Sequence, residues 1–514
     1  WEDAVLDVAF QAHVIRRACP GMAVTPFLVL MDRDREATVD GLNQLFKVVS
    51  RDGRKQVQVA PGTTPAQLGA DILATINVDA DVRKVWALKF RLDGTEEPLG
   101  FEPLVRKLAS LHESGRRGFC GVGKKCKRCE FTYSSDAARR QDQVRRGLKS
   151  GRNECWAQAT GQPPDPERPT VLEIWSFRGA DDLIRQKKYF LSDVEQDDLG
   201  DGKRAERQWM QVDKARRADR SPWIDRANLS AEMRRWTYPL HFIDFETSRV
   251  AIPFNKGRRP YEQIAFQFSH HEVDAGGAVR HKGQWLEARP GRFPNFDFVR
   301  ALKGQLDQDA GTVFCYSPHE NTVLGEIAEQ LEASAEPDRR ELGAWIRTIT
   351  WRKAGRDEVT RGKRCMVDMW KLVVSHHYDP HTRGSNSLKA VLPAIIHSSD
   401  RLRGKYGKPV YGTPQMPSLN FQGWTWIQAQ HGNDPYRALP PLFTETEEAA
   451  LSEYVQDTRQ IEEGGEAMTA YAKLQFVDIP EPERKRLAAG LLRYCELDTL
   501  AMVMLYEYWR DECG

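Results

Sequence analysis

The sequence has none of the long apolar runs that a membrane protein needs. No stretch of its 514 residues approaches the ~18 uninterrupted apolar residues of a membrane-spanning helix, and no signal-peptide pattern opens the chain. Internal repeats and low-complexity tracts are missing too. We therefore expect a cytoplasmic protein that does not engage a membrane.

Net charge is also nearly absent. The chain has 75 Lys and Arg against 73 Asp and Glu, a formal balance of +2. This balance excludes a uniformly basic coat for nucleic acid, although it is compatible with a local basic track. Nine cysteines are an odd number in a chain without a secretory signal, so we expect reduced thiols and a metal site rather than a disulfide framework.

The chain is long enough for several cores. At ~150 residues per domain, 514 residues predict two to four domains, and 40% apolar with 29% charged residues is typical of a globular protein. A Pro-rich stretch at 162–169 indicates a linker, and strands and helices alternate after Trp236. Because the chain begins at Trp1, inside an apolar helical pattern, we expect it to be a fragment. We predict an α/β unit at 1–160, a linker and helical segment at 161–235, and an α/β domain at 236–514.

Hydrophobic periodicity outlines the first unit. Apolar residues recur at helical spacing over 5–15, 65–73 and 101–111. The apolar runs at 27–31 and 45–49 are typical of short strands around a turn. We expect a small α/β unit.

The segment 101–160 is basic and rich in cysteine. It has fourteen Lys and Arg against six Asp and Glu, and four of the nine cysteines: Cys120, Cys126, Cys129 and Cys155. The spacing of Cys126 and Cys129 lets two thiolates of one tight turn face the same metal. The four cysteines would complete a zinc site; an iron–sulfur cluster and a reduced pair without metal are the competing interpretations.

Four cations surround this cysteine pair: Lys124, Lys125, Lys127 and Arg128. They favour the thiolate form of the cysteines. They also predict a phosphate-contacting patch, with a merely solvated surface as the alternative.

The strongest chemical signal lies in the second half. Asp244 and Glu246 stand two apart on the apolar strand pattern at 238–247, so both project from one face. Two like charges placed together need compensation, and a divalent cation such as Mg²⁺ or Mn²⁺ provides it through hard oxygen ligands.

Further candidates come from later in the chain. Tyr494 and Asp498 stand one turn apart on the helical pattern at 491–503. Glu320 opens a helix after the apolar strand pattern at 312–316, a common place for site residues in α/β folds. The strand-like segment 365–370 offers Asp368.

Together these motifs resemble the DEDDy branch of the DnaQ-like 3′→5′ exonucleases, which have an RNase H-like fold. In that family motif I is Asp-x-Glu, motif II is an acidic residue at a strand–helix junction, and motif III is Tyr-x3-Asp. The resemblance assigns Asp244 and Glu246 to motif I, and Tyr494 and Asp498 to motif III. Glu320 is placed as motif II, with Asp368 as its alternative.

The resemblance extends beyond these motifs. The segments 251–253, 259–264, 266–269, 387–393 and 434–436 are similar to a bacterial family of uncharacterised proteins in which a RecB-like half precedes a DnaQ-like half. Residues 7–11 resemble the helix that follows the catalytic Glu-x-Lys strand of RecB-like PD-(D/E)XK nucleases, with Gln11 as the motif glutamine. No Asp…Glu-x-Lys constellation follows Trp1, so we expect a partial nuclease here.

The cysteines resemble the iron–sulfur members of the RecB-like group. Cys126, Cys129 and Cys155 match the last three ligands of the stapled cluster. The resemblance implies a [4Fe–4S] cluster whose first cysteine would lie before Trp1, with Cys19 or Cys120 as substitutes within this sequence, and zinc stays the alternative.

The resemblance implies an exonuclease that hydrolyses phosphodiester bonds at single-stranded DNA ends. Two Mg²⁺ or Mn²⁺ ions ~3.5–4 Å apart would be held by the four motif carboxylates, and Tyr494 would position the attacking water. Arg258 and Arg259 would meet phosphate, while Phe245, Phe254 and Tyr261 would stack a base or pack in the core. The alternatives are a nucleic-acid-binding scaffold and an exonuclease that acts on RNA.

The remaining histidines and cysteines have no predicted chemistry. The pairs at 270–271 and 376–377 are expected on strand or loop surfaces, where adjacent side chains point apart. Cys315, Cys365 and Cys495 lie in apolar runs and are expected to be packed thiols.

Overall fold

The computed structural model describes residues 1–51, 54–90, 97–116, 118, 121–134, 137–165, 168–354, 358–442, 464–476 and 479–514. The chain forms two units: unit 1 comprises Trp1–Asp32 and Leu73–Asp219, and unit 2 comprises Arg33–Ile72 and Arg220–Gly514. This division differs from the predicted boundaries at 160 and 235. Residues 33–72 join unit 2 because their backbone bonds to it: Ala37 N donates to Arg258 O at 2.9 Å, and Gly41 N donates to Phe254 O at 2.8 Å.

Unit 1 also extends further than predicted. Residues 171–212 complete a hydrophobic core around the fully buried Trp156. The predicted strand at 27–31 forms, but it pairs with residues 73–77 rather than with the strand at 46–51. Its helices and strands are α1 (Glu2–Ala18), β1 (Phe27–Met31), β4 (Leu73–Asn77), α3 (Asp79–Ala87), β5 (Lys89–Phe90), β6 (Leu99–Gly100), α4 (Phe101–Glu113), α5 (Ala137–Arg145), α6 (Gly151–Thr160), α7 (Ala180–Arg185) and α8 (Lys203–Arg216).

A five-stranded mixed sheet forms the centre of unit 2. Its strand order is β10-β9-β8-β11-β14, with β8 (Leu240–Arg249), β9 (Gln263–Val273), β10 (Val279–Leu286), β11 (Val313–Cys315) and β14 (Val367–Asp368). Within this sheet, β8, β9 and β10 are antiparallel neighbours, whereas β11 and β14 run parallel to β8. The mixed α/β class predicted for this half is confirmed.

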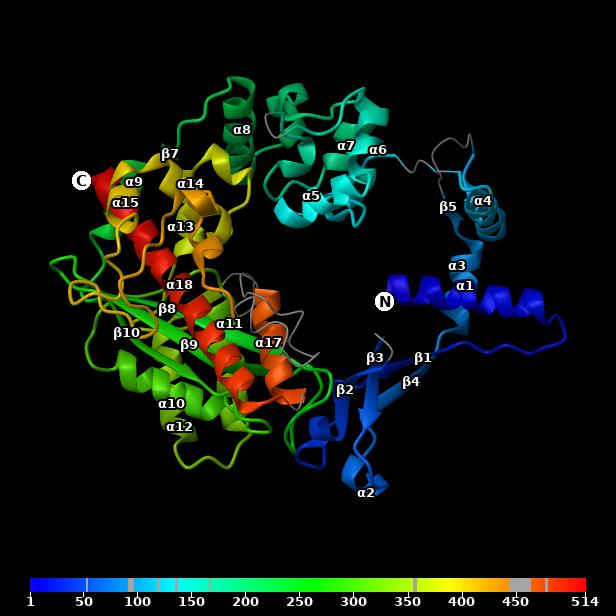
Figure 1. The fold of residues 1–514 in the computed structure, drawn as a ribbon, viewed down its shortest axis with the longest axis horizontal. Helices are drawn as coiled ribbons and strands as arrows, with labels where there is room; N and C mark the ends of the chain where they lie inside the picture. Colours follow the sequence, from blue (N-terminus) through cyan, green and yellow to red (C-terminus); the bar gives the residue numbers. More distant parts are fainter. Residues whose placement is uncertain are drawn as a thin grey trace. The chain divides into compact units, whose positions relative to one another are not determined.

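Helices cover both faces of this sheet. Figure 1 shows α18 (Glu481–Cys513) crossing one face, while α10 (Asn295–Leu306) and α12 (Arg339–Ile349) lie on the other. The core on the α18 side also includes residues of α13 (Met369–His376), α14 (Leu388–Ser398) and α17 (Gly464–Phe476). Helix α11 (His319–Glu332) packs in the core on the α10 side. The remaining elements of unit 2 are β2 (Phe46–Arg51), β3 (Arg54–Val59), α2 (Pro65–Leu68), β7 (Trp223–Ile224), α9 (Arg226–Met233), β12 (Trp351–Ala354), β13 (Glu358–Arg361), β15 (His377–Tyr378) and α15 (Asp400–Tyr406).

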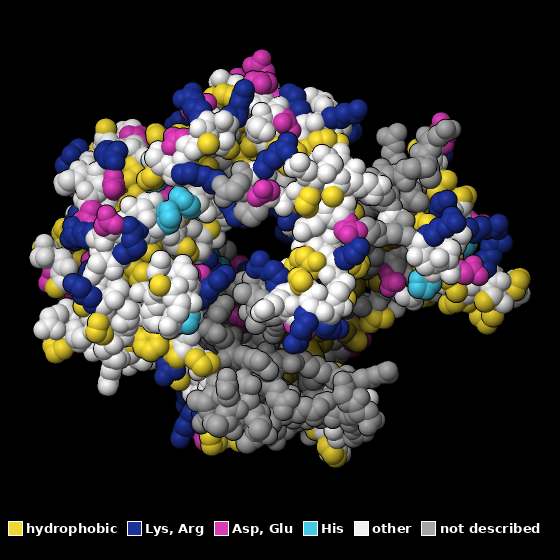
Figure 2. Space-filling view, turned by 45° about the horizontal axis from the view of Figure 1, so that its top comes forward, with side chains coloured by type: hydrophobic (Ala, Val, Ile, Leu, Met, Phe, Trp, Pro, Cys, Tyr) yellow, Lys and Arg dark blue, Asp and Glu magenta, His cyan; other side chains and the backbone are white. Residues whose placement is uncertain are grey.

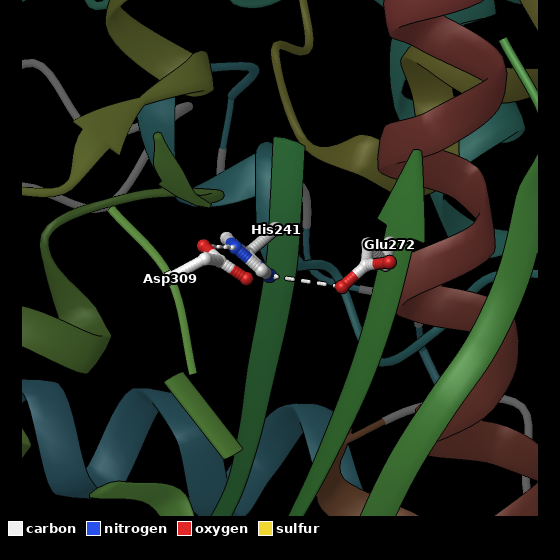
Figure 3. Close-up of side chains that lie close together, drawn as sticks. All are labelled: His241, Glu272 and Asp309. Carbon is white, nitrogen blue, oxygen red and sulfur yellow. Dashed lines mark hydrogen bonds and ion pairs between the residues drawn. The ribbon is translucent and has the colours of Figure 1, made fainter. Parts of the chain in front are cut away.

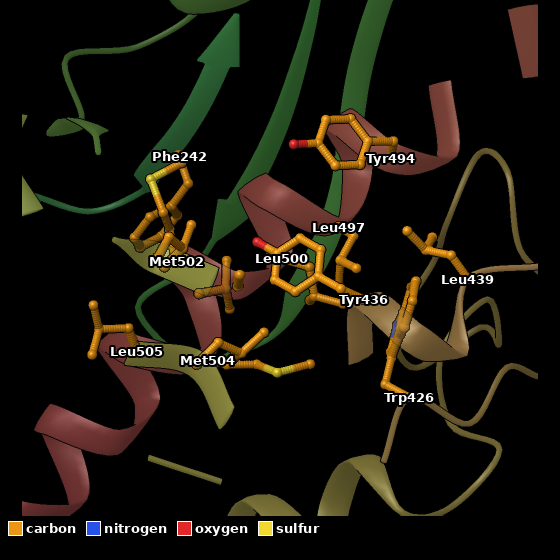
Figure 4. Close-up of a cluster of buried hydrophobic side chains, with 14 of the residues drawn as sticks. Phe242, Trp426, Tyr436, Leu439, Tyr494, Leu497, Leu500, Met502, Met504 and Leu505 are labelled. Carbon is orange, nitrogen blue, oxygen red and sulfur yellow. The ribbon is translucent and has the colours of Figure 1, made fainter. Parts of the chain in front are cut away.

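Strand β8 serves two cores because its side chains alternate. Leu240 and Phe242 pack in the core on the α18 side, whereas Ile243 and Phe245 pack in the core on the α10 side. Figure 4 shows Phe242 beside Met502 of α18 within the first core. Near-continuous burial of β8 on both faces explains why its sequence is so apolar.

A buried polar network anchors α18 on the sheet. Glu496, fully buried, lies 3.1 Å from His281 Nδ1 and accepts a hydrogen bond from the Tyr411 hydroxyl. One turn away, the Thr499 hydroxyl bonds to His271 Nδ1 at 2.7 Å. Because the buried bonds of Glu496 and Thr499 reach partners outside the helix, the network fixes the rotation of α18 about its own axis.

The histidine pairs are not on the surface as predicted. His270 and His271 are both fully buried on β9, and His377 is buried too. They do point apart: His270 bonds to His241 and Gln305 on one side of the sheet, and His271 faces α18 on the other. Burial, followed by the charge of His241, lowers the pKa of His270 to about 3, so this ring stays neutral and serves as a structural hydrogen-bonding group.

No helix among the described residues combines the length and the apolarity needed to span a bilayer.

Truncation of Phe242 tests the core that supports α18. This side chain is fully buried and stacks on Phe314 with ring centroids 4.9 Å apart. We expect Phe242→Ala to lower the free energy of unfolding by about 3–5 kcal/mol, because it leaves a cavity under the helix. Urea denaturation followed by circular dichroism measures this change. Leu419→Ala, at a side chain 55% exposed, is the control and should shift stability by less than about 0.5 kcal/mol; equal shifts would contradict the assignment.

Candidate active site

Strand β8 directs two carboxylates at α18. Asp244 and Glu246 continue the face that begins with Leu240 and Phe242, so they extend the apolar contact with α18 into a polar one. Glu246 is 7% exposed, and Asp244 is partly buried. The predicted common face of the two carboxylates is confirmed.

Helix α18 contributes three side chains to the same place. Asp498 is buried, and its Oδ1 accepts a hydrogen bond from the Tyr436 hydroxyl at 2.5 Å. Tyr494 lies one turn earlier on the helix and is also buried. Between them, the Cys495 thiol donates to Asp244 Oδ2 at 3.5 Å and so ties the helix to β8.

Glu320 enters the site from the first turn of α11. The helix starts directly after β11, which pairs with β8, so the turn delivers this side chain beside the strand. Glu320 is only 2% exposed, and within the described part of the chain its Oε2 atom is buried without a hydrogen-bond partner. A buried carboxylate oxygen without a partner carries a large desolvation cost unless something cationic completes its environment.

Asp368 has a capping role one strand further along. Its Oδ1 accepts from the backbone N–H of Ser317 at 3.0 Å and from that of Lys371 at 3.4 Å, so it caps α13 and holds the turn before α11. Its carboxylate lies 3.5 Å from the Lys371 ammonium. Asp368 Oδ2, like Glu320 Oε2, is buried without a hydrogen-bond partner among the described residues, and the charge of Asp368 contributes to the raised pKa of Glu320. Asp368 also supports the turn that carries Glu320, and the choice between the two motif II candidates stays a prediction.

Burial, and after it the charges of neighbouring carboxylates, governs the ionisation of these side chains. Burial, and then the charge of Asp498, raises the pKa of Asp244 well above its ordinary value. Burial, followed by the charges of Asp244 and Asp498, raises the pKa of Glu246 in the same way. Burial and the charge of Asp244 also raise the pKa of Glu320. Within the described part of the chain, these carboxylates are therefore costly to ionise together unless a cation joins them.

Lys389 is the cation that faces this cluster. It extends from the start of α14, with its ammonium 4.8 Å from the centre of the Tyr494 ring and 5.1 Å from that of Tyr436. Burial raises the pKa of Asp498, and Lys389 is the first influence that opposes this rise. Lys389 also lowers the pKa of Asp244 and of Glu246.

Sequence reasoning missed three residues of the site: Lys389, Tyr436 and Cys495. Lys389 and Tyr436 lie in segments whose family likeness was noted without any role. No spacing rule connects them to Asp244, because long connections separate all three elements. Cys495 is packed as predicted, and its bond to Asp244 adds a role at the site.

The donor set fits a hard divalent cation. Oxygen atoms of Asp244 and Glu246 lie within 4.8 Å of each other and of the Cys495 sulfur. Burial, followed by the charge of Asp244, raises the pKa of the Cys495 thiol, which therefore stays protonated and acts as a hydrogen-bond donor rather than a ligand. The unpartnered Glu320 oxygen supplies a further hard ligand atom, so the site suits Mg²⁺ or Mn²⁺ better than a soft metal.

The predicted cysteine site is not assembled by the described residues. Cys126, on the short helix η2 (Lys124–Arg128), is buried, and Cys129 and Cys155 are partly exposed. In the described ranges these sulfur atoms form no group within 4.8 Å of one another, and Cys120 lies outside those ranges. The iron–sulfur and zinc interpretations therefore stay predictions. So does the phosphate role of the exposed cations around Cys126, namely Lys124, Lys125, Lys127 and Arg128.

The two predicted phosphate-binding arginines are engaged within unit 2. Arg258 lies 3.1 Å from Glu262 and covers the Phe293 ring at 3.9 Å, and Arg259 pairs with Glu36 at 3.1 Å. Phe245 and Phe254 are buried and take the core-packing role, whereas Tyr261 is 36% exposed. The phosphate role of the two arginines stays a prediction that would require these pairs to exchange.

A second histidine–carboxylate group lies nearer the start of β8. Figure 3 shows His241 between Asp309 and Glu272; His241 Nε2 lies 2.7 Å from Asp309 and its Nδ1 lies 3.9 Å from Glu272. Glu272 is already paired with Arg280 and Lys282. Because Lys282 also lies 3.8 Å from Asp309, side-chain cations already compensate both carboxylates, and this group fits a buried ion-pair network better than a metal site.

Repulsion among the site carboxylates predicts a pH dependence of stability. Their folded-state pKa values are raised, so the folded protein holds protons that the unfolded chain has released above the ordinary values of 3.8 and 4.5. The stability contributed by the protonated groups is therefore complete below those values and is lost as the pH rises through the raised folded-state pKa values.

Thermal melting in EDTA and in Mn²⁺ tests this prediction. In EDTA we expect the melting temperature to fall as the pH rises above 5, and to fall less in Asp244→Asn. Mn²⁺ at a hundred-fold excess over its Kd should stabilise the wild type by about 2.7 kcal/mol and Asp244→Asn by much less. Asp400→Asn, at a side chain 99% exposed, should behave as the wild type. An equal response of Asp244→Asn to Mn²⁺ would argue against a metal site here.

Comparison with known families places one match over this site. A family described as Domain of unknown function (DUF2779) matches residues 241–387. The matched range includes Asp244, Glu246 and Glu320, and it ends before α14 and α18. No curated protein and no solved structure matches the chain.

Proposed function

We propose that unit 2 is a metal-dependent 3′→5′ exonuclease that hydrolyses phosphodiester bonds at single-stranded DNA ends. One observation carries the proposal: β8, α11 and α18 bring Asp244, Glu246, Glu320 and Asp498 together at one buried place, where the charges of the other carboxylates raise the pKa of Glu246 and of Glu320. Carboxylates buried close together are unfavourable in their ionised forms, because burial and neighbouring charges raise their pKa values. Such clusters are therefore commonly found at functional sites.

The architecture supports an RNase H-like fold for this unit. Three antiparallel strands continue into two strands parallel to the first, and helices cover both faces of the sheet. The Asp-x-Glu pair lies on the first of these strands, in the middle of the sheet, and Tyr-x3-Asp lies on the last helix. These are the positions that the DnaQ-like resemblance requires.

The residues of the site divide into metal-holding and water-positioning groups. Asp244, Glu246, Glu320 and Asp498 would hold divalent ions, which supply a nucleophilic water of lowered pKa and stabilise the leaving 3′-oxygen. Burial, followed by the charge of Asp498, raises the pKa of Tyr494, so its hydroxyl keeps its proton and can donate to or orient a water. The Tyr436 hydroxyl holds Asp498 in place through their hydrogen bond.

Lys389 balances the cluster from the α14 side. Its positive charge favours ionised Asp244, Glu246 and Asp498 over their protonated forms, which keeps them competent as ligands. Its position against the Tyr494 and Tyr436 rings holds the ammonium beside the side chains assigned to metal and water.

Nuclease activity of the purified chain is the direct test. We expect a 5′-labelled single strand of DNA with Mn²⁺ to give a ladder of products shortened from the 3′ end. Asp244→Asn should reduce the rate by more than about 100-fold, because loss of second-shell partners alone already costs 10–100-fold at metal sites. Asp400→Asn makes the same chemical change at an exposed carboxylate and should retain full activity.

The other outcomes distinguish the alternative functions. Binding of the strand without any Mn²⁺-dependent product would favour a nucleic-acid-binding scaffold. Preferential shortening of an RNA strand of the same sequence would favour an RNA exonuclease. Full activity in Asp244→Asn would refute the assignment of the site.

Tyr494→Phe tests the role of the phenol. Removal of the hydroxyl should lower kcat by about 10–100-fold while the melting temperature stays within a few degrees, because the ring still packs. Tyr508→Phe on the same helix is the matched control: Tyr508 is 1% exposed, and in the described residues its hydroxyl has no hydrogen-bond partner. Single-turnover measurements on both variants compare the chemical step; equal rates would remove Tyr494 from the mechanism.

A further inference from the structure

A second feature of unit 2 is a groove along the edge strand β14. It has a volume of about 730 Å³ and follows the sheet edge from Thr237 and Gly311 at one end to Asp368 and Lys371 at the other. The hairpin of β12 and β13 forms one wall through Trp351 and Arg361. We call this feature the edge groove.

The charge of the edge groove is predominantly positive. Its cations are Arg235, Arg361, Lys363, Arg364 and Lys371, against the two carboxylates of Glu232 and Asp368. Arg235 pairs with Glu232, and Arg364 is held by Asp309 and by backbone carbonyls. Arg361 and Lys363 are exposed and have no ion pair with any described residue. These two cations are available to an anionic ligand.

This charge is local. On the face drawn in Figure 2, dark-blue Lys and Arg side chains are spread over the surface with magenta Asp and Glu side chains among them. The whole chain carries a net charge of only +2. Two exposed cations without an ion pair among the described residues therefore give this groove a local positive charge that suits an anionic ligand such as a phosphate backbone.

Aromatic side chains accompany the cations. Trp351 pairs across the hairpin with Arg361, so both side chains project from the same face into the groove. The Lys371 ammonium lies 5.1 Å from the centre of the Trp351 ring. Trp236, partly exposed, lines the opposite wall. Indole rings between cations are what a single strand needs, since bases stack on the rings while phosphates meet the charges.

One end of the edge groove borders the carboxylate site. Asp368 lines the groove and accepts a hydrogen bond at 3.0 Å from Ser317 N. Ser317 belongs to the turn that opens α11, and Glu320 is the second residue of that helix. A single strand of DNA that follows the groove along β14 toward Asp368 would therefore arrive beside Glu320.

From this arrangement we infer that the edge groove holds single-stranded DNA and leads its 3′ end to the carboxylate site. Delivery of the 3′ end to the carboxylate site rests on the proposed nuclease function. Binding of single-stranded DNA in the edge groove by Arg361, Lys363 and Trp351 is independent of catalysis.

Equilibrium binding in EDTA tests the groove without catalysis. A fluorescent single strand of DNA is titrated with the full chain, and anisotropy is read at several salt concentrations. Arg361→Glu with Lys363→Glu should weaken binding by about 10-fold or more. It should also reduce the slope of log K against log salt by about 1.4, since each phosphate contact to a single strand contributes about 0.7.

A matched variant controls for the change of net charge. Arg352 lies on the same hairpin but pairs with Thr360, so it projects from the face opposite to Trp351 and Arg361. Arg340 is exposed on α12 and does not line the groove. Arg340→Glu with Arg352→Glu makes the same charge change and should leave affinity within about 2-fold. An equal loss of affinity in both double variants would overturn the groove.

Kinetics on two substrates separate this inference from the proposed function. With Mn²⁺, the groove variant should raise KM for a long single strand by about 10-fold. It should leave hydrolysis of the p-nitrophenyl ester of thymidine 5′-monophosphate unchanged, because that ester reaches only the carboxylate site. A wild type that cleaves neither substrate refutes the nuclease, while the EDTA titration still decides the groove. Unchanged KM and unchanged affinity in the groove variant refute the groove, even if the nuclease is real.

Discussion

Repulsion among buried carboxylates is the constraint on which unit 2 depends. Asp244 and Glu246 share a face of β8, and α18 lies on that face with Asp498. Glu320 joins them from α11 with an oxygen that has no partner in the described part of the chain. Burial, and then the charges of neighbouring carboxylates, raises the pKa values of Asp244, Glu246 and Glu320, so their ionised forms are costly without a compensating positive charge.

The surrounding structure holds the helix against this repulsion. The long α18 is buried along most of its length, and its apolar residues form the larger core with β8, α14 and α17. Glu496 and Thr499 then fix its rotation through buried partners on the sheet. The favourable apolar packing of α18 on the sheet therefore offsets the unfavourable proximity of the carboxylates. Stability is commonly given up in this way at functional sites. The positions of Tyr494 and Asp498 follow from that rotation.

Charge in this protein is arranged locally rather than overall. The near-zero balance of the chain combines an acidic site, a groove with exposed cations and several neutralised pairs such as Arg259 with Glu36. The His241 group also gathers buried acidic side chains, but there Lys282 and Arg280 already neutralise Glu272. The cluster at Asp244 has only Lys389 in that role among the influences on its ionisation. This difference is what separates a structural ion-pair network from a candidate metal site.

The sequence alone determined which residues of β8 and of α18 share a face at the candidate site. Alternation on β8 and the four-residue spacing on α18 predict which side chains share a face, because strand and helix periods are local properties of the backbone. Burial of His270 and His271, the membership of residues 33–72 in unit 2, and the roles of Lys389 and Tyr436 were decided only by tertiary structure. Those features depend on contacts between segments that are distant in the chain, and no local pattern encodes which distant surface will cover a strand or face a carboxylate.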